Sequence, residues 1–141
     1  MNRQGWLLLA IAQAGDKGLS PIQIQKTMFL LRMEAADYVG QRFYTFKPYN
    51  YGPFSSVIYK EVDFLVFSGM LREQQSDNYN IYVATTAGRD RANTLIQRLD
   101  EKPKRYLVKL VRWVTSVDFG QLLRSVYAKY PKYATKSLFR S

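Results

Sequence analysis

The 141-residue sequence contains neither cysteine nor histidine. The absence of cysteine excludes disulfides and thiolate nucleophiles, and the two absences together exclude the zinc sites that these residue types build. A Ser-His-Asp triad and a histidine general base are excluded for the same reason. Many hydrolytic and redox mechanisms are therefore closed to this chain.

Other signs of catalysis are also lacking. The sequence has no GxGxxG fingerprint and no Walker-type glycine-rich loop that would cradle phosphates. Its carboxylates are scattered, and Glu34 and Asp37, one helical turn apart, indicate an exposed helical face. We therefore expect a non-enzymatic protein without a cofactor or a metal site.

Long apolar runs are absent too. A membrane-spanning helix needs roughly 18 or more consecutive apolar residues, whereas the run from Trp6 to Ala12 is far shorter. The small residues after it resemble a signal-peptidase site, but the run is slightly too short for a secretory signal. We expect this segment to form a first core helix in a cytoplasmic protein with no membrane span.

Positive charge is what the sequence has in excess, with a net charge of +10. Residues 1–100 hold eleven basic and nine acidic side chains, while residues 101–141 hold ten basic and two acidic ones. A one-signed region of this kind attracts polyanions such as nucleic acid or anionic lipid. Simple solubility is the alternative interpretation of the same charge.

The periodicity of apolar residues predicts a mainly α fold of the α+β class. Ser20-Pro21 is a helix start, and the polar turn at 76–78 lies between two segments typical of a β-hairpin. We expect helices over 3–14, 20–40, 54–68, 86–99, from Pro103 and over 118–130, with an extended segment at 42–54. This order is that of a winged helix-turn-helix domain (1–100) with a β-hairpin wing. Residues 101–141 would form a basic helical extension packed on it, ending in a mobile tail.

Three segments resemble a known family. They are IQKTMFLL from Ile24, YGPFS from Tyr51 and YVATTAG from Tyr82. Together they are similar to the YwgA-like phage-associated proteins and the related Panacea, or SocA-like antitoxin, superfamily, over about residues 5–97. The resemblance implies a winged-helix-like fold and, for Panacea domains, the neutralising of partner toxins. Phe54 departs from that pattern, which tends to have valine there.

The first functional hypothesis is a small regulator that binds duplex DNA. Cations at helical spacing would neutralise phosphates, while residues of the helix over 54–68 and of the wing would approach the groove. The predicted nucleic-acid-binding residues are Lys102, Arg105, Lys109, Arg112, Lys132, Lys136, Ser56, Tyr59, Lys60 and Asn78.

The second hypothesis is an antitoxin-like module that docks a protein such as a toxin. The outer face of the helix over 54–68 has one cation and one anion, which is poor for reading bases. The predicted partner-binding residues are Tyr59, Asp63 and Phe67. A homodimer is a further expectation, with Trp113 as an apolar contact.

The segment YNYGPFS, from Tyr49 to Ser55, is interpreted as structural. Gly52 would permit a sharp reversal, Pro53 would fix the first helical turn, and Phe54 would anchor the next helix in the core. Tyr51 would pack around this corner. The segment would then aim the helix over 54–68.

Overall fold

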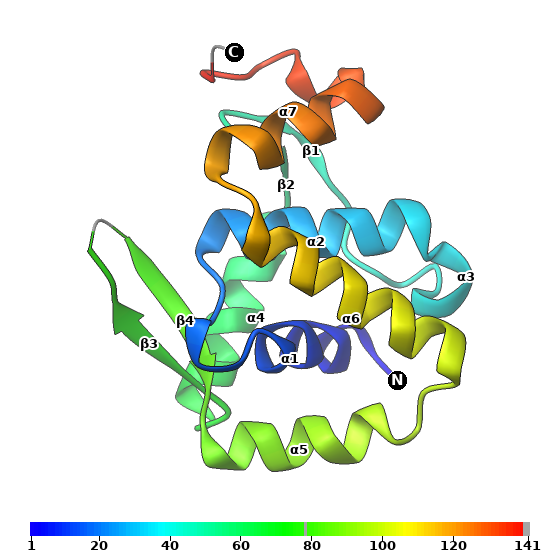
Figure 1. Ribbon diagram of the computed structural model, residues 1–141, viewed down its shortest axis with the longest axis vertical. Helices are drawn as coiled ribbons and strands as arrows, with labels where there is room; N and C mark the ends of the chain where they lie inside the picture. Colours follow the sequence, from blue (N-terminus) through cyan, green and yellow to red (C-terminus); the bar gives the residue numbers. More distant parts are fainter. Residues whose placement is uncertain (78, 140–141) are drawn as a thin grey trace.

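The computed structural model describes residues 1–77 and 79–139. These residues form a mainly α body with two separate antiparallel hairpins, so the predicted α+β class is confirmed (Figure 1). In chain order the elements are α1 (Arg3–Gln13), η1 (Gly15–Lys17), α2 (Pro21–Glu34), α3 (Ala36–Val39), β1 (Lys47–Tyr49), β2 (Gly52–Phe54), α4 (Ser56–Phe67), β3 (Leu71–Gln75), β4 (Asn80–Ala84), α5 (Thr86–Ile96), α6 (Glu101–Ser116), α7 (Phe119–Lys129) and η2 (Pro131–Ala134).

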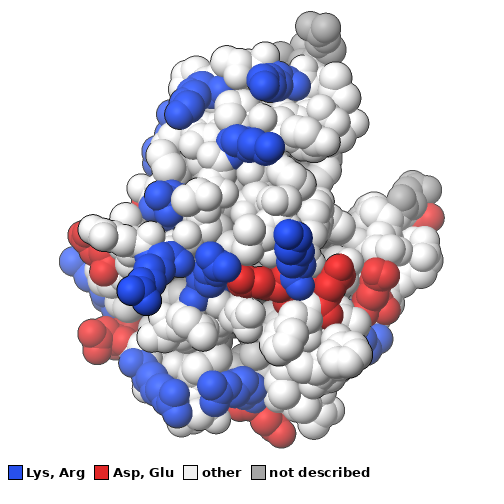
Figure 2. Space-filling view, turned by 180° about the vertical axis from the view of Figure 1, so that it is seen from behind, with Lys and Arg blue, Asp and Glu red and all other residues white. Residues whose placement is uncertain are grey.

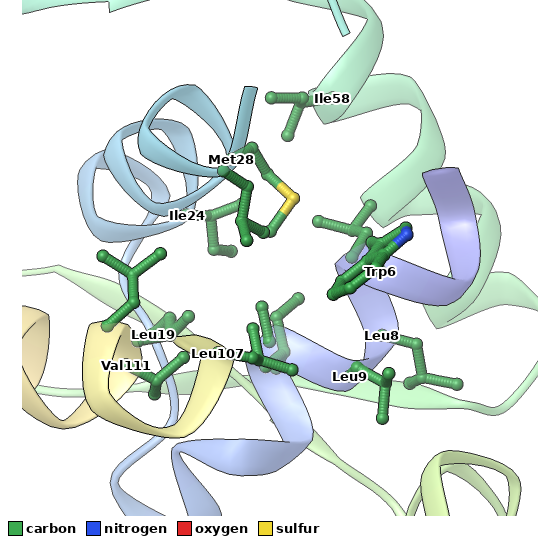
Figure 3. Close-up of a cluster of buried hydrophobic side chains, with 14 of the residues drawn as sticks. Trp6, Leu8, Leu9, Leu19, Ile24, Met28, Ile58, Leu107 and Val111 are labelled. Carbon is green, nitrogen blue, oxygen red and sulfur yellow. The ribbon is translucent and has the colours of Figure 1, made fainter. Parts of the chain in front are cut away.

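Helix α1 lies at the centre of the fold. Its residues from Trp6 to Ile11 are all buried, because α2, α4, α5 and α6 surround it (Figures 1 and 3). Leu107 and Val111 of α6 reach the same core as Ile58 of α4. The C-terminal helices therefore share one hydrophobic core with the first hundred residues.

Helix α2 begins where the sequence predicts and ends earlier. Ser20 and Gln23 form a capping box: Ser20 Oγ accepts from the Gln23 amide at 3.2 Å, and Gln23 Oε1 accepts from the Ser20 amide at 2.9 Å. The expected end near Gly40 is wrong, because Ala35 leaves helical geometry at φ −129° and the short α3 follows. This break turns the chain back over α2.

The YNYGPFS segment is a β-hairpin, which differs from the prediction. Pro53 lies in β2 opposite Pro48 of β1, and α4 starts only at Ser56, so Pro53 does not fix a helical turn. Both prolines are tolerated because a two-stranded sheet is all edge. Gly52 makes the predicted reversal at φ +95°. Phe54 is half-buried and packs on Tyr49 and Tyr59, with ring centroids 4.7 and 5.5 Å away, instead of anchoring α4 in the core.

The second hairpin, β3–β4, confirms the predicted strand pair over 71–84. It is also joined to the segment before α2: Leu19 N donates to Tyr82 O at 3.1 Å, and Tyr82 N donates to Leu19 O at 2.9 Å. Gly18 allows this approach, since its φ is +61° and a Cβ there would lie 2.4 Å from the Tyr82 carbonyl oxygen. Leu19 thus adds one residue of a third strand.

The C-terminal segment packs along the first hairpin. Helix α6 starts at Glu101, two residues before the predicted start at Pro103, with Asp100 as its N-cap residue. In the segment where the sequence predicts a mobile tail, the Tyr133 ring contacts Phe29 at a centroid distance of 4.7 Å, and Leu138 N donates to Asn50 O at 2.7 Å. Residues 131–139 therefore cover the β1–β2 turn.

Candidate nucleic-acid interface

Helix α6 has an apolar side toward the core and a basic side toward solvent. Its buried residues include Leu107, Leu110 and Val114, which recur at helical period. The opposite side is exposed and carries four cations, named here the α6 stripe: Lys102, Arg105, Lys109 and Arg112. At 1.5 Å of rise per residue the stripe is about 15 Å long. The four cations predicted from the sequence are thus in one line.

Few of the described cations make ion pairs. Arg3, Arg89, Lys104 and Lys129 each have a carboxylate within 4.0 Å. In the described part of the chain, no member of the stripe makes an ion pair. An uncompensated line of this kind leaves its field directed at solvent.

Lys132 and Lys136 are exposed and lie in or after η2, beyond α7 from the stripe (Figure 1). Lys132 Nζ sits 5.7 Å from the centroid of the Tyr133 ring. Seen from behind, the uppermost part of the molecule carries Lys and Arg without Asp or Glu, and the two signs mix lower down (Figure 2). The upper end of this rear face is therefore positive.

A pocket of about 400 Å³ adjoins the α6 stripe. We call it the α6 pocket. Its walls come from α2, α6 and α7, and its lining combines aromatic and aliphatic side chains with a few polar ones. Lys109 belongs both to the stripe and to the pocket. The other residues of α6 that line the pocket are Tyr106, Leu110 and Trp113. Its size falls within the range of ligand-binding pockets.

Glu34 lies in this pocket as the centre of a polar cluster. Its carboxylate accepts hydrogen bonds from Tyr130 Oη at 2.8 Å, from Tyr106 Oη at 3.3 Å and from Lys129 Nζ. Burial alone would raise the pKa of Glu34, but the hydrogen bonds from Lys129 and both tyrosines outweigh it and lower the pKa. Glu34 is exposed, as its spacing with Asp37 predicts, and the sequence did not reveal its hydrogen bonds to residues of α6 and the end of α7.

The outer face of α4 is exposed and close to neutral. Ser56, Tyr59, Lys60, Asp63 and Phe67 all lie on the surface, as their spacing predicts. Phe67 is 90% exposed, which is extreme for an aromatic ring, and Phe64 is exposed as well. This face therefore presents more aromatic surface than charge.

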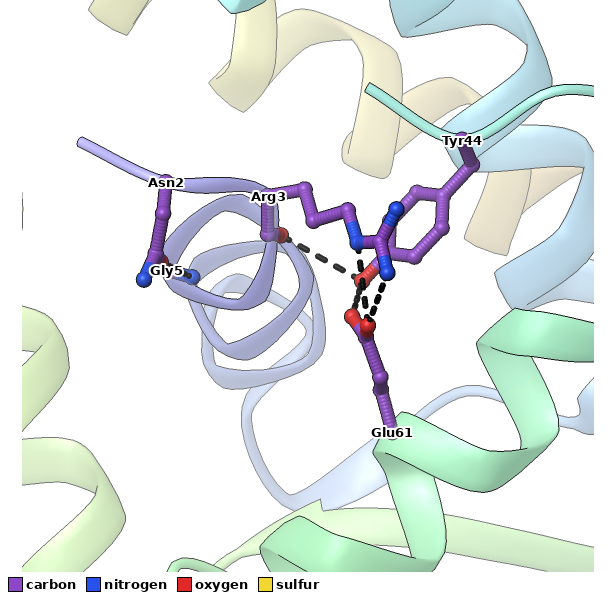
Figure 4. A network of polar contacts seen from close by, with 5 residues as sticks. All are labelled: Asn2, Arg3, Gly5, Tyr44 and Glu61. Atoms are coloured by element: carbon purple, nitrogen blue, oxygen red, sulfur yellow. Dashed lines mark hydrogen bonds and ion pairs between the residues drawn. The ribbon is translucent and has the colours of Figure 1, made fainter. Parts of the chain in front are cut away.

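Glu61 belongs to the same helix but points inward. It accepts two hydrogen bonds from the Arg3 guanidinium, at 2.6 and 2.9 Å, and one from Tyr44 Oη at 2.6 Å (Figure 4). Burial, and then the bond to Glu61, raises the pKa of Tyr44, so its hydroxyl keeps its proton. This network explains an acidic residue on the apolar side of α4 and joins that helix to α1.

The two sets of predicted DNA-binding residues lie on opposite sides of the molecule. In Figure 1, α6 is in front of α1 and α2, and α4 is behind them; Figure 3 shows α1 between the other two helices. Ser56, Tyr59 and Lys60 are therefore separated from the α6 stripe by the core. Asn78 lies outside the described residues. A straight duplex on the stripe does not reach α4.

Sequence reasoning missed the polar contacts under the YGPFS segment. Gln25 pairs with both backbone groups of Ser55, donating from Nε2 to its carbonyl and accepting from its amide, each at 2.9 Å. Lys26 is 3% exposed, and its Nζ donates to Pro53 O at 3.2 Å. Burial lowers the pKa of Lys26 to about 7. The signal was Gln25-Lys26 inside an otherwise apolar run, which calls for buried partners.

Comparisons with known proteins give no relative with which this site can be compared. The chain matches no protein-family model, no curated protein and no solved structure. No described helix has the length and apolar character needed to cross a bilayer.

Proposed function

We propose that this chain is a non-enzymatic protein of the winged-helix class that binds duplex DNA through the α6 stripe. A winged-helix core is supported by the order α1, Leu19, α2, α4, β3 and β4, with Leu19 paired to β4. The short turn of a helix-turn-helix is replaced by α3 and the β1–β2 hairpin. The resemblance to YwgA-like and Panacea proteins stays a prediction that agrees with this order.

The observation that carries the DNA hypothesis is the uncompensated α6 stripe. Its four cations are exposed along one line of a single helix, and none of them makes an ion pair among the described residues. Such a line contacts phosphates without reading bases, so binding would depend little on sequence. A role on DNA also agrees with the cytoplasmic location expected from the sequence.

The experiment is a titration of a labelled duplex of random sequence at several salt concentrations. If each stripe cation neutralises one phosphate, log K falls with log salt at a slope of about −3.6. The absence of binding at low salt, or binding that does not depend on salt, would contradict the proposal. The matched control is Lys60→Gln, which removes one exposed cation from α4 and leaves the slope unchanged.

Protein docking through α4 is the second candidate function, and Phe67 is the observation that favours it. The exposed rings of Tyr59, Phe64 and Phe67 lie on α4 together with Asp63 and give this helix much aromatic surface with few charges. Surfaces that lack charge and are rich in aromatic residues are typical of the centres of protein interfaces. A toxin-like protein is the partner that the family resemblance suggests.

This candidate is tested by co-purification from the cells that produce the protein. A partner that binds α4 accompanies the unchanged protein and the Lys102→Gln variant, and is lost with Phe67→Ser. A partner retained by Phe67→Ser would contradict docking at this face. Sedimentation of the purified protein alone shows whether a second copy is the occupant.

A further inference from the structure

The α6 pocket lies beside the α6 stripe and has aromatic side chains in its lining. Trp113 and Tyr106 lie on α6 next to Lys109, and the opposite wall is formed by Ser125, Val126 and Lys129 of α7. Lys109 and Lys129 are both exposed. A nucleic-acid strand whose phosphates contacted the stripe would therefore pass with its bases within reach of Trp113.

Aromatic rings next to cations favour a nucleobase as the ligand of this pocket. Bases stack on aromatic side chains, and cations beside the rings hold the backbone of the same strand. Glu34, on the α2 side of the pocket, already accepts three hydrogen bonds and has about four acceptor positions as a carboxylate. A fourth donor to this carboxylate would be an amino or ring N–H, which a base has and a lipid chain lacks. Lys129 is paired with Glu34, whereas Lys109 makes no ion pair among the described residues.

We propose that the α6 pocket receives an unpaired base of the DNA strand that lies on the α6 stripe. The inference rests on the proposed function and refines its ligand: DNA with a single-stranded gap, not a continuous duplex, is the preferred form. In a continuous duplex the bases are paired and stacked, so the pocket stays empty and only the stripe contributes. One base stacked on Trp113 is expected to favour gapped DNA by about 10-fold.

The test compares a blunt duplex with the same duplex interrupted by a gap of a few nucleotides. Binding is followed by tryptophan fluorescence, since Trp6 is 2% exposed and Trp113 is the one other tryptophan. Gapped DNA should quench the Trp113 emission and bind about 10-fold more tightly, whereas the duplex should leave the emission nearly unchanged.

Two variants locate the effect. Ser125→Leu places a larger side chain at the wall of the pocket from an exposed position, so the fold does not depend on the residue removed. Ala128→Leu adds apolar volume at an exposed site of α7 outside the pocket lining. Ser125→Leu should abolish the preference and the quenching while keeping duplex affinity. Ala128→Leu should change neither.

The outcomes separate the two proposals. Equal, salt-dependent affinity for both DNA forms without quenching overturns the pocket inference and leaves the stripe proposal standing. A preference for gapped DNA that survives Ser125→Leu also overturns it. No binding of either form overturns the proposed function, and the pocket inference with it.

Discussion

Helices α4 and α6 place opposite kinds of surface on opposite sides of one core. The outer side of α4 combines exposed aromatic rings with one cation and one anion, whereas the outer side of α6 carries four cations and no described ion pair among them. If the proposed winged-helix fold is right, α4 has the position of the helix that usually reads bases. The comparison teaches that the excess charge of this chain lies away from α4, in residues 101–141, and that α6 holds only part of it.

The largest effect that can test this contrast comes from removing the stripe. Replacing Lys102, Arg105, Lys109 and Arg112 together with Gln should weaken duplex binding by at least 100-fold at low salt, because several phosphate contacts are lost at once. Anisotropy titration measures the change. Circular dichroism should show an intact fold, since all four side chains are exposed. A loss under 3-fold would place the DNA contact elsewhere.

The next effect concerns how α4 is held. Glu61→Ala removes the acceptor of Arg3 and Tyr44 and leaves the Tyr44 hydroxyl without that partner, so the free energy of unfolding should fall by about 2–3 kcal/mol. Chemical denaturation measures the loss. Glu73→Ala is the control, because Glu73 is exposed and accepts only a 3.2 Å bond from Tyr82. Equal losses in both variants would contradict a special role for the network.

Lys26 gives a pH-dependent effect that neither surface shares. Its pKa is lowered in the folded state, so the unfolded chain binds more protons above about pH 7 and stability rises with pH there. Between pH 7 and pH 9 the gain is about 2 kcal/mol relative to Lys26→Met. Denaturation of both proteins at the two pH values measures it. Above pH 10 the raised tyrosine pKa values, that of Tyr82 being about 12, act in the opposite sense. A parallel pH dependence in Lys26→Met would contradict this account.

The smallest effect expected is on stability at the tip of α4. Phe67→Ser should change the free energy of unfolding by less than about 0.5 kcal/mol, because the ring is 90% exposed. Thermal unfolding measures it. Leu65→Ser on the same helix, at a buried position, is the matched comparison and should cost several times more. A large loss of unfolding free energy in Phe67→Ser would mean that the ring stabilises the fold, which would contradict a role for it in binding a partner.

The sequence allowed much of the fold to be predicted because its local signals are strong. Ser20-Pro21 with Gln23 marks a helix start in any context, and the alternating strands of 71–84 flank a clear polar turn. The α6 stripe followed from helical spacing alone. The YGPFS segment was misjudged because its geometry depends on Gln25 and Lys26, about thirty residues away in the chain. Tertiary contacts of that kind leave no periodicity to detect.

The sequence also could not predict on which side of the molecule each surface lies. Spacing places Lys60 on α4 and Lys109 on α6, but only packing decides that α1 and α2 separate them (Figure 1). The α6 pocket depends in the same way on the packing that brings Lys129 and Tyr130 to Glu34. Helix faces were predictable one at a time, and their arrangement was not.

The most direct test of the central claim is the salt slope of duplex binding in two single variants. Arg105→Gln removes one stripe cation and Lys60→Gln removes one from α4, and both side chains are exposed. If the stripe is the contact, Arg105→Gln reduces the magnitude of the slope by about 0.9 and Lys60→Gln leaves it unchanged. A reduced slope in Lys60→Gln with an unchanged one in Arg105→Gln would contradict the account and assign the DNA contact to α4.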